Sequence, residues 1–139
     1  MLDQSNSSLT VFSDGGARGN PGPAASAFVI YENDKLIKQD SKYLGETTNN
    51  VAEYNGVILA LQSIANNSQI KFCMDSELVV KQLNGLYKIK DKKLIELAQE
   101  VKMMIKSNNL KVNFVHVLRE KNKIADALVN EKLDNSSRL

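Results

Sequence analysis

Residues 9–32, LTVFSDGGARGNPGPAASAFVIYE, are the most informative stretch for the fold of this chain of 139 residues. The apolar run at residues 9–13 predicts a first strand, and residues 24–32 predict a second. Between them, residues 15–23 are so dense in glycine and proline that a turn is expected. This segment therefore predicts two consecutive strands, with Asp14 directly after the first.

The rest of the chain alternates between helix and strand patterns. Asn33 and Asp34 suit a tight reversal, so a third strand over residues 35–45 is expected to pair antiparallel with the second. Apolar residues at helical spacing predict helices, and short apolar runs predict buried strands. After the third strand, the patterns predict a helix over 51–65 with a cap within 47–50, and then a strand over 69–74. A helix capped by Asp75 and Ser76 and stopped by Gly85 follows, and Asp91 opens another helix. The last two elements are a strand over 110–118 and a helix capped by Asn122. This order favours an α/β fold with one mixed sheet and helices on its faces.

Length and composition narrow the class of protein. The size predicts a single domain over residues 9–134, with polar segments 1–8 and 135–139 as flexible tails. No apolar run approaches the roughly 20 residues that span a bilayer, and the N-terminus lacks a signal pattern, so a cytoplasmic location is expected. The single cysteine, Cys73, excludes an internal disulfide and a cysteine-based zinc site.

The charge pattern leaves two interpretations open. The formal net charge of +2 is too small to identify a polyanionic partner. Lysines are concentrated between Lys81 and Lys106, and charge alone favours a solvated helix face there. A patch that follows nucleic-acid phosphates is the alternative.

Four carboxylates, Asp14, Glu53, Asp75 and Asp126, lie at strand ends or in the first turns of helices. Ligand sites of open α/β sheets gather at one end of the strands, so folding would bring these side chains together. A cluster of like charges needs cations or protons, and ligands that are all oxygen favour magnesium or manganese. The pattern predicts a metal site.

Each carboxylate also has a purely structural interpretation. Asp75 is a good helix cap, Asp14 suits a turn, Glu53 suits a capping box, and Asp126 suits a helix N-terminus. Four separate structural roles leave the shared arrangement unexplained, so the joint catalytic interpretation is preferred.

Four motifs in this order resemble those of the ribonuclease H type 1 family. They are DGGARGNPGP from Asp14, TTNNVAEYNG from Thr47, DSELVVKQLNG from Asp75 and REKNKIAD from Arg119, and the resemblance covers residues 9–133. It is nearer to the compact, archaeal-type branch, because there is no room between Gly85 and Asp91 for the basic protrusion of the longer bacterial form. The resemblance implies the ribonuclease H-like fold, a five-stranded mixed sheet of order 3-2-1-4-5 with helices on both faces.

The resemblance also implies a function. The family hydrolyses the RNA strand of RNA–DNA hybrids with two Mg²⁺ or Mn²⁺ ions, leaving 5′-phosphate and 3′-hydroxyl ends. It implies that Asp14 bridges the two ions, that Asp126 completes the site that activates water, and that Glu53 and Asp75 hold the second ion. An arginine takes the place of the bacterial loop histidine in the compact branch, which favours Arg119 over His116 as the residue that assists catalysis.

Further residues are expected to bind the substrate. Backbone amides and amide side chains near the site suit the 2′-hydroxyls in the wide minor groove of an A-form duplex. Thr48 resembles a residue that binds a phosphate of the DNA strand, while Glu77 replaces a glutamine of many relatives and is expected to alter affinity. The expected substrate-binding residues are Gly15, Gly16, Asn20, Thr48, Asn49, Asn50, Glu77, Lys88 and Lys90.

Three other functions compete with this one. A non-catalytic nucleic-acid module would be expected to lack a carboxylate, and all four are present. An actin-like ATPase shares the Asp-Gly-Gly hairpin but needs a longer chain and a second matching loop. A related nuclease that also cleaves double-stranded RNA stays open. The expected partner is the hybrid duplex, with a monomeric protein and no membrane.

Overall fold

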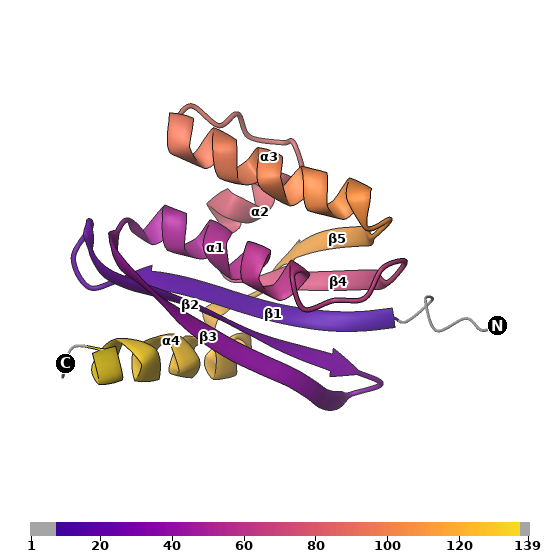
Figure 1. The fold of residues 1–139 in the computed structure, drawn as a ribbon, viewed down its shortest axis with the longest axis horizontal. Coiled ribbons are helices and arrows are strands. Elements are labelled where there is room, and N and C mark those ends of the chain that lie inside the picture. The colour runs from indigo at the N-terminus through magenta and orange to yellow at the C-terminus, as the bar shows by residue number, and fades with distance from the viewer. Residues whose placement is uncertain (1–7, 137–139) are drawn as a thin grey trace.

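The computed structural model describes residues 8–136 as one five-stranded sheet with helices on both faces (Figure 1). Strand β1 pairs antiparallel with β2 and parallel with β4, and the sheet order is β3-β2-β1-β4-β5. This confirms the predicted order of strands. The elements are β1 (Ser8–Ala17), β2 (Gly22–Glu32), β3 (Lys35–Thr47), α1 (Asn49–Leu61), β4 (Gln69–Met74), α2 (Glu77–Leu83), α3 (Lys92–Ser107), β5 (Lys111–His116), a 3-10 turn (Arg119–Lys121) and α4 (Lys123–Ser136).

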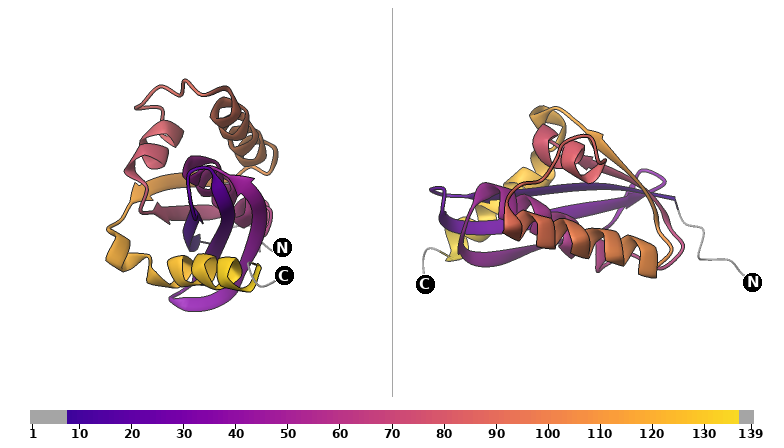
Figure 2. Two further views of the ribbon diagram at one scale, coloured as in Figure 1. Left: turned by 90° about the vertical axis from the view of Figure 1, so that its left-hand side faces the viewer. Right: turned by 90° about the horizontal axis from the view of Figure 1, so that it is seen from above.

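The helices divide into two layers around the sheet. Helices α1, α2 and α3 lie on one side and α4 lies on the other (Figures 1 and 2). The main core lies between the sheet and the first layer, because alternate strand residues such as Val11, Phe28 and Phe72 point that way. A smaller cluster of Ala25, Ala27, Val129 and Leu133 joins β2 to α4. Helix α4 packs mainly against β2, β3 and β1.

Three helix starts follow the predicted capping chemistry. Thr48 Oγ1 accepts a hydrogen bond from the Val51 amide, and Ser76 Oγ accepts one from the Val79 amide. Asp91 Oδ1 accepts from the amide of Leu94 at 3.1 Å. Each cap satisfies an amide that has no partner within its own helix. These caps fix where α1, α2 and α3 begin.

The turn predicted over residues 15–23 is shorter in the structure. Strand β1 continues through Gly15 and Gly16 to Ala17, and these residues pair with Ser26, Ala25 and Ala24 of β2. The glycines therefore do not form the turn, which is confined to residues 18–21. At Gly15 the reason is packing, because an added Cβ would lie 2.3 Å from the backbone carbonyl of Ala52 in α1.

Other boundaries differ by a few residues. Helix α1 ends at Leu61 rather than at residue 65, and β5 ends at His116 rather than at residue 118. Asn122 directly precedes α4, but its Oδ1 makes no hydrogen bond, so it is not a side-chain cap. Strand and helix also extend into the predicted tails, to Ser8 and Ser136. The remaining tail residues, 1–7 and 137–139, lie outside the described residues. Within residues 8–136, no helix combines the length and the apolar character that crossing a membrane requires.

Candidate active site

Three carboxylates from three elements meet at one end of the central strands. Asp14 lies within β1, paired with Ala27, rather than after the strand as predicted. The parallel register places Ser13 beside Met74, so Asp75, the residue after β4, lies next to Asp14. Glu53 reaches the same place from α1. Carboxylate oxygens of Asp14, Glu53 and Asp75 all lie within 4.8 Å of one another, a grouping that could hold a metal ion.

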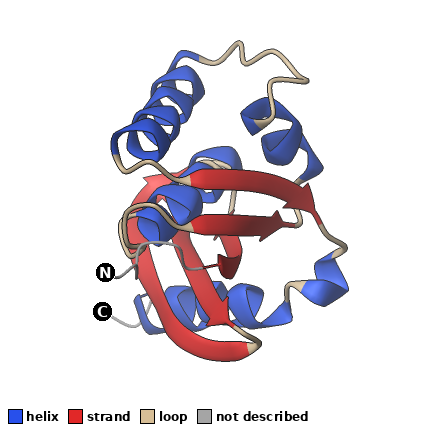
Figure 3. Ribbon diagram, turned by 90° about the vertical axis from the view of Figure 1, so that its right-hand side faces the viewer, coloured by secondary structure: helices blue, strands red, loops and turns tan. Residues whose placement is uncertain are grey.

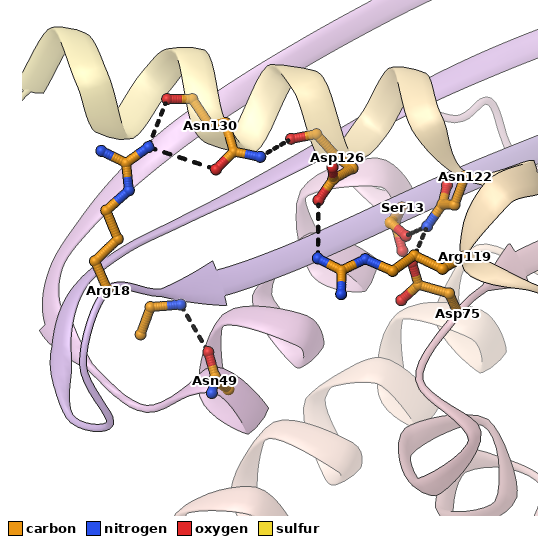
Figure 4. A network of polar contacts seen from close by, with 9 residues as sticks. Ser13, Arg18, Asn49, Asp75, Arg119, Asn122, Asp126 and Asn130 are labelled. Atoms are coloured by element: carbon orange, nitrogen blue, oxygen red, sulfur yellow. Dashed lines mark hydrogen bonds and ion pairs between the residues drawn. The ribbon is translucent and has the colours of Figure 1, made fainter.

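The fourth carboxylate arrives from the opposite layer. Asp126 lies in the first turn of α4 and lines the same pocket as the triad, a hollow of about 440 Å³. The pocket also includes Arg119, whose Nη2 lies 3.9 Å from Asp126 Oδ1 (Figure 4). The fold therefore brings all four predicted carboxylates to one pocket, although only three form the tight group.

Crowding and burial change the acidity of this group. Burial, followed by the nearby Asp75 charge, raises the pKa of Asp14 to about 7. Burial and the charges of Asp14 and Asp75 also raise the pKa of Glu53 well above its ordinary value. Glu53 Oε2 is buried and accepts no hydrogen bond. A buried carboxylate without a donor is costly unless a proton or a cation satisfies it. The oxygen-only group therefore fits a hard divalent cation.

Without a cation, the charge on Asp14 is expected to destabilise the fold. Its pKa is about 7 in the folded state against 3.8 as the ordinary value, so the folded protein binds the proton more tightly than the unfolded chain. The parent should therefore lose stability as pH rises from about 4 to about 7. We expect Asp14→Asn to be more stable than the parent at pH 7.5 by on the order of 2 kcal/mol.

Urea denaturation in chelator at about pH 4 and about pH 7.5 measures this difference. The two proteins should differ much less at the lower pH, because it lies close to the ordinary pKa of 3.8 and little of the destabilisation by the Asp14 charge has developed there. A variant that is less stable than the parent at pH 7.5 would contradict the expectation.

Comparison with known proteins identifies the family. Residues 12–132 match the family model described as reverse transcriptase-like. Over 131 residues the chain is 37% identical to ribonuclease HI of Halobacterium salinarum, which covers 88% of this chain. The chain belongs to the type 1 ribonuclease H family. It spans 63% of that halobacterial protein, and about a third of the length of bifunctional protein Rv2228c of Mycobacterium tuberculosis, to which it is 35% identical over 130 residues.

Solved ribonuclease H structures share the whole fold. LC11-RNase H1, isolated from compost by a metagenomic approach, was solved in complex with an RNA/DNA hybrid. In that complex it is 40% identical to this chain, with a TM-score of 0.87 and coverage of 92% of this chain and 98% of that one. The N-terminal RNase H domain of Rv2228c has a TM-score of 0.87 at 32% identity, covering 96% and 98%.

Asn122 belongs to the site, although its place in the sequence predicted only a helix cap. Its side chain is buried, and Nδ2 donates to the backbone carbonyl of Ser13 at 2.8 Å and to Asp75 Oδ2 at 3.4 Å (Figure 4). Asn122 therefore ties the start of α4 to both β1 and the Asp75 carboxylate. Its presence in the REKNKIAD motif was the available signal.

Arg18 was also not predicted. It lines the pocket from the β1–β2 turn, forms an ion pair with Asp134 at 2.7 Å, and donates to the backbone carbonyl and Oδ1 of Asn130 at 3.4 Å. Asn130 in turn donates to the carbonyl of Asp126 (Figure 4). These contacts fasten the hairpin to the helix that carries the fourth carboxylate. The position of Arg18 inside the DGGARGNPGP motif was the only hint in the sequence.

The predicted amide residues beside the site support one another. Asn49 Oδ1 accepts from the Ala17 amide at 2.8 Å, and Asn20 Oδ1 accepts from the Asn49 amide at 3.0 Å. Gly15, Gly16 and Asn49 line the pocket. The carboxamide oxygens thus hold the hairpin against α1, which leaves their NH₂ groups for other partners. Thr48 caps α1, and Asn50 is half-buried in its first turn.

The remaining predicted residues lie away from the pocket lining. Glu77 Oε2 pairs with Lys81 Nζ at 3.1 Å, and Lys81 also contacts the Tyr87 hydroxyl at 3.3 Å. Lys88 and Lys90 are exposed in the segment between α2 and α3. His116 is exposed at the end of β5 and does not line the catalytic pocket. Of the two candidates for an assisting residue, the structure brings Arg119 to the carboxylates.

Proposed function

We propose that this protein is an endoribonuclease that hydrolyses the RNA strand of RNA–DNA hybrids, leaving 5′-phosphate and 3′-hydroxyl ends. The observation that carries the proposal is the convergence of Asp14, Glu53, Asp75 and Asp126 on one open pocket. Support comes from LC11-RNase H1, a protein that is 40% identical to this chain and was crystallised with an RNA/DNA hybrid.

Two divalent cations, Mg²⁺ or Mn²⁺, would be held by the four carboxylates. When bound, such ions activate a water molecule and stabilise charge on the leaving oxygen of an in-line displacement. Asp14 is the proposed shared ligand, because Glu53 and Asp75 group with it and the charge of Asp126 also acts on it. Glu53 and Asp75 would complete one side of the site, and Asp126 the other. The donor-free oxygen of Glu53 supports this assignment.

The surrounding residues would hold this arrangement rigid. Strand β1 lies at the centre of the sheet and fixes Asp14, while Asn122 restrains Asp75 by a hydrogen bond. A guanidinium group is unsuited to act as a general base, so Arg119 is not assigned that role. We assign it to steering a phosphate or the departing product near Asp126.

The substrate duplex would lie across the hairpin and the start of α1. Amides near Gly15 and Gly16 and the NH₂ groups of Asn20, Asn49 and Asn50 suit the 2′-hydroxyls of the RNA strand. The Thr48 hydroxyl accepts from an amide within α1, which leaves its hydrogen for a DNA-strand phosphate. Further along, the charge of Glu77 is offset by Lys81, and Lys88 and Lys90 are the proposed DNA-strand contacts.

Arg119 and His116 give opposite predictions. We expect Arg119→Ala to lower kcat by roughly 10- to 100-fold, because it removes the cation beside Asp126. His116→Ala should stay within about twofold of the parent, since that side chain is exposed outside the pocket. Steady-state kinetics of hybrid cleavage measures both. Equal losses, or a larger loss for His116→Ala, would reject the assignment.

The proposed function is tested with a labelled RNA–DNA hybrid beside matched double-stranded RNA and double-stranded DNA. Each duplex is incubated with the protein in Mg²⁺, Mn²⁺ or chelator, and the ends of the products are mapped. Metal-dependent cutting of RNA in the hybrid supports the proposal, and cutting of double-stranded RNA would place the protein in the broader class. Binding without cutting in either metal would favour a non-catalytic module. The monomeric state and the cytoplasmic location stay predictions.

A further inference from the structure

A second hollow lies beside the catalytic pocket, past the segment that connects β5 to α4. Arg119 lines the catalytic pocket, and residues 120–125 line this second hollow of about 580 Å³. Figure 3 shows the short 3-10 turn of this segment at the side of the sheet, ahead of α4. We call this hollow the back groove and define it by six of its lining residues: Thr10, Phe12, Tyr31, Lys71, Lys121 and Lys123.

The floor of the back groove is formed by strand residues. The strand register places Tyr31, Thr10, Lys71 and Asn113 in one row across β2, β1, β4 and β5. Phe12 lies two residues further along β1, and its ring meets the Tyr31 ring edge-to-face at 6.0 Å. Both rings are half-buried. The floor therefore combines an aromatic pair with the Thr10 hydroxyl, and Lys71 lies beside Thr10.

The groove is also elongated. A neighbouring hollow of about 560 Å³ shares Thr10 and Lys71 with it and adds Lys111 and Asn113. Both hollows reach Lys71 of β4, whereas α4 packs mainly against β2, β3 and β1. An elongated groove fits an extended polymer better than it fits a small ion.

The rim carries cations that the protein does not neutralise. Lys71, Lys121 and Lys123 are exposed, and none forms an ion pair within residues 8–136. Asp34 and Glu120 are the acidic residues that line the back groove, and the neighbouring hollow has Lys111 and no acidic residue among the described residues that line it. The positive excess selects an anionic occupant.

We propose that the back groove binds single-stranded nucleic acid. Unpaired bases stack on aromatic side chains while lysines follow the phosphates, a combination that suits the Phe12–Tyr31 pair and the three rim lysines. A duplex keeps its bases inside, so an aromatic floor offers it nothing to stack on. Residues 120–125 of the groove directly follow Arg119 of the catalytic pocket, so a single-stranded extension of a bound duplex would have only this short segment to cross. The proposal does not depend on catalysis.

Fluorescence anisotropy tests the proposal with labelled oligouridine and oligothymidine of about 12 nucleotides. Chelator is present throughout, and the intact protein is used. The variant Lys71→Ser/Lys123→Ser removes two rim charges. The matched control, Lys38→Ser/Lys42→Ser, removes two exposed charges from the edge strand β3, whose residues line neither hollow. We expect roughly tenfold weaker binding for the groove variant and a change within about twofold for the control. Equal weakening in both, or no binding by the parent, overturns the proposal.

Nuclear magnetic resonance locates the bound strand. Amide signals of Thr10, Phe12 and Lys71 should shift with oligonucleotide, and comparing RNA with DNA shows which strand is preferred. Shifts confined to Asp14 and Asn49 would place the strand in the catalytic pocket and reject the groove. An acidic peptide that contains phenylalanine serves as a second probe. If this peptide shifts the groove signals and the oligonucleotides do not, the nucleic-acid proposal is rejected. Hybrid cleavage by the lysine variant should stay within about twofold of the parent, so failure of either proposal is visible separately.

Discussion

Asp14→Asn is expected to lower kcat for hybrid cleavage by at least about a thousandfold. The Asp14 carboxylate lies within 4.8 Å of both Glu53 and Asp75 oxygens, and the charge of Asp126 also acts on it. Asparagine keeps the size of the side chain but removes the negative charge that would hold a divalent cation. Single-turnover cleavage of a labelled hybrid in saturating Mg²⁺ or Mn²⁺ measures the loss.

A matched control distinguishes loss of the cluster from loss of a charge. Asp40 is exposed on β3, and its Oδ1 accepts from the adjacent Ser41 amide, a bond that asparagine can also make. Asp40→Asn should therefore retain parental kcat within about twofold. Urea denaturation checks whether unfolding causes the loss of activity. Asp14→Asn is expected to be at least as stable as the parent. Retention of a tenth or more of parental kcat by Asp14→Asn would refute the central role of this residue.

Gly15→Ala is expected to destabilise the protein by about 3 kcal/mol or more. An added Cβ would lie 2.3 Å from the carbonyl carbon and oxygen of Ala52 and 2.5 Å from the amide nitrogen of Glu53. These are backbone atoms of α1, so the helix itself would have to move away from β1. Since α1 carries Glu53, the displacement should also separate Glu53 from Asp14 and lower kcat in the molecules that remain folded.

Gly16→Ala provides the control one residue away in the same strand. The nearest atom to its added Cβ is Cγ1 of Val129, at 3.8 Å, which is an ordinary contact. Neither glycine has a positive φ, so alanine is compatible with the backbone at both positions. We expect Gly16→Ala to change stability by no more than about 1 kcal/mol. Urea denaturation and hybrid cleavage of both variants check this contrast, and similar behaviour of the two would show that the approach of α1 to Gly15 does not limit stability.

Local patterns were sufficient for most elements and for the choice of the four carboxylates. Alternation of apolar residues is set by the geometry of one strand, and capping by Thr48, Ser76 and Asp91 is set within a single helical turn. The turn predicted over residues 15–23 was placed too early because the role of Gly15 depends on a distant contact. Glycine at positions 15 and 16 resembles turn chemistry locally, while its use at Gly15 depends on Ala52, in a helix much later in the chain.

In the functional site, too, local sequence identified the residues and folding determined their contacts. Motif order identified Asp14, Glu53, Asp75 and Asp126, because each occurs in a distinctive neighbourhood of residues. Their grouping depends on the parallel register of β1 and β4 and on α4 crossing the other face, and local sequence specifies neither contact. The bonds of Asn122 to Ser13 and Asp75 join residues 109 and 47 positions apart.

The periodicity of the elements, the family motifs and the acidic residues available for catalysis could all be read from the chain without its fold. Three features emerged only from the folded arrangement: which carboxylates form the tight group, the use of Gly15 for helix packing, and the hydrogen bonds of Asn122 to Ser13 and Asp75. The physical reason is that propensity and capping act over a few residues. Proximity in the site arises from strand register and layer packing, which join residues far apart in the chain.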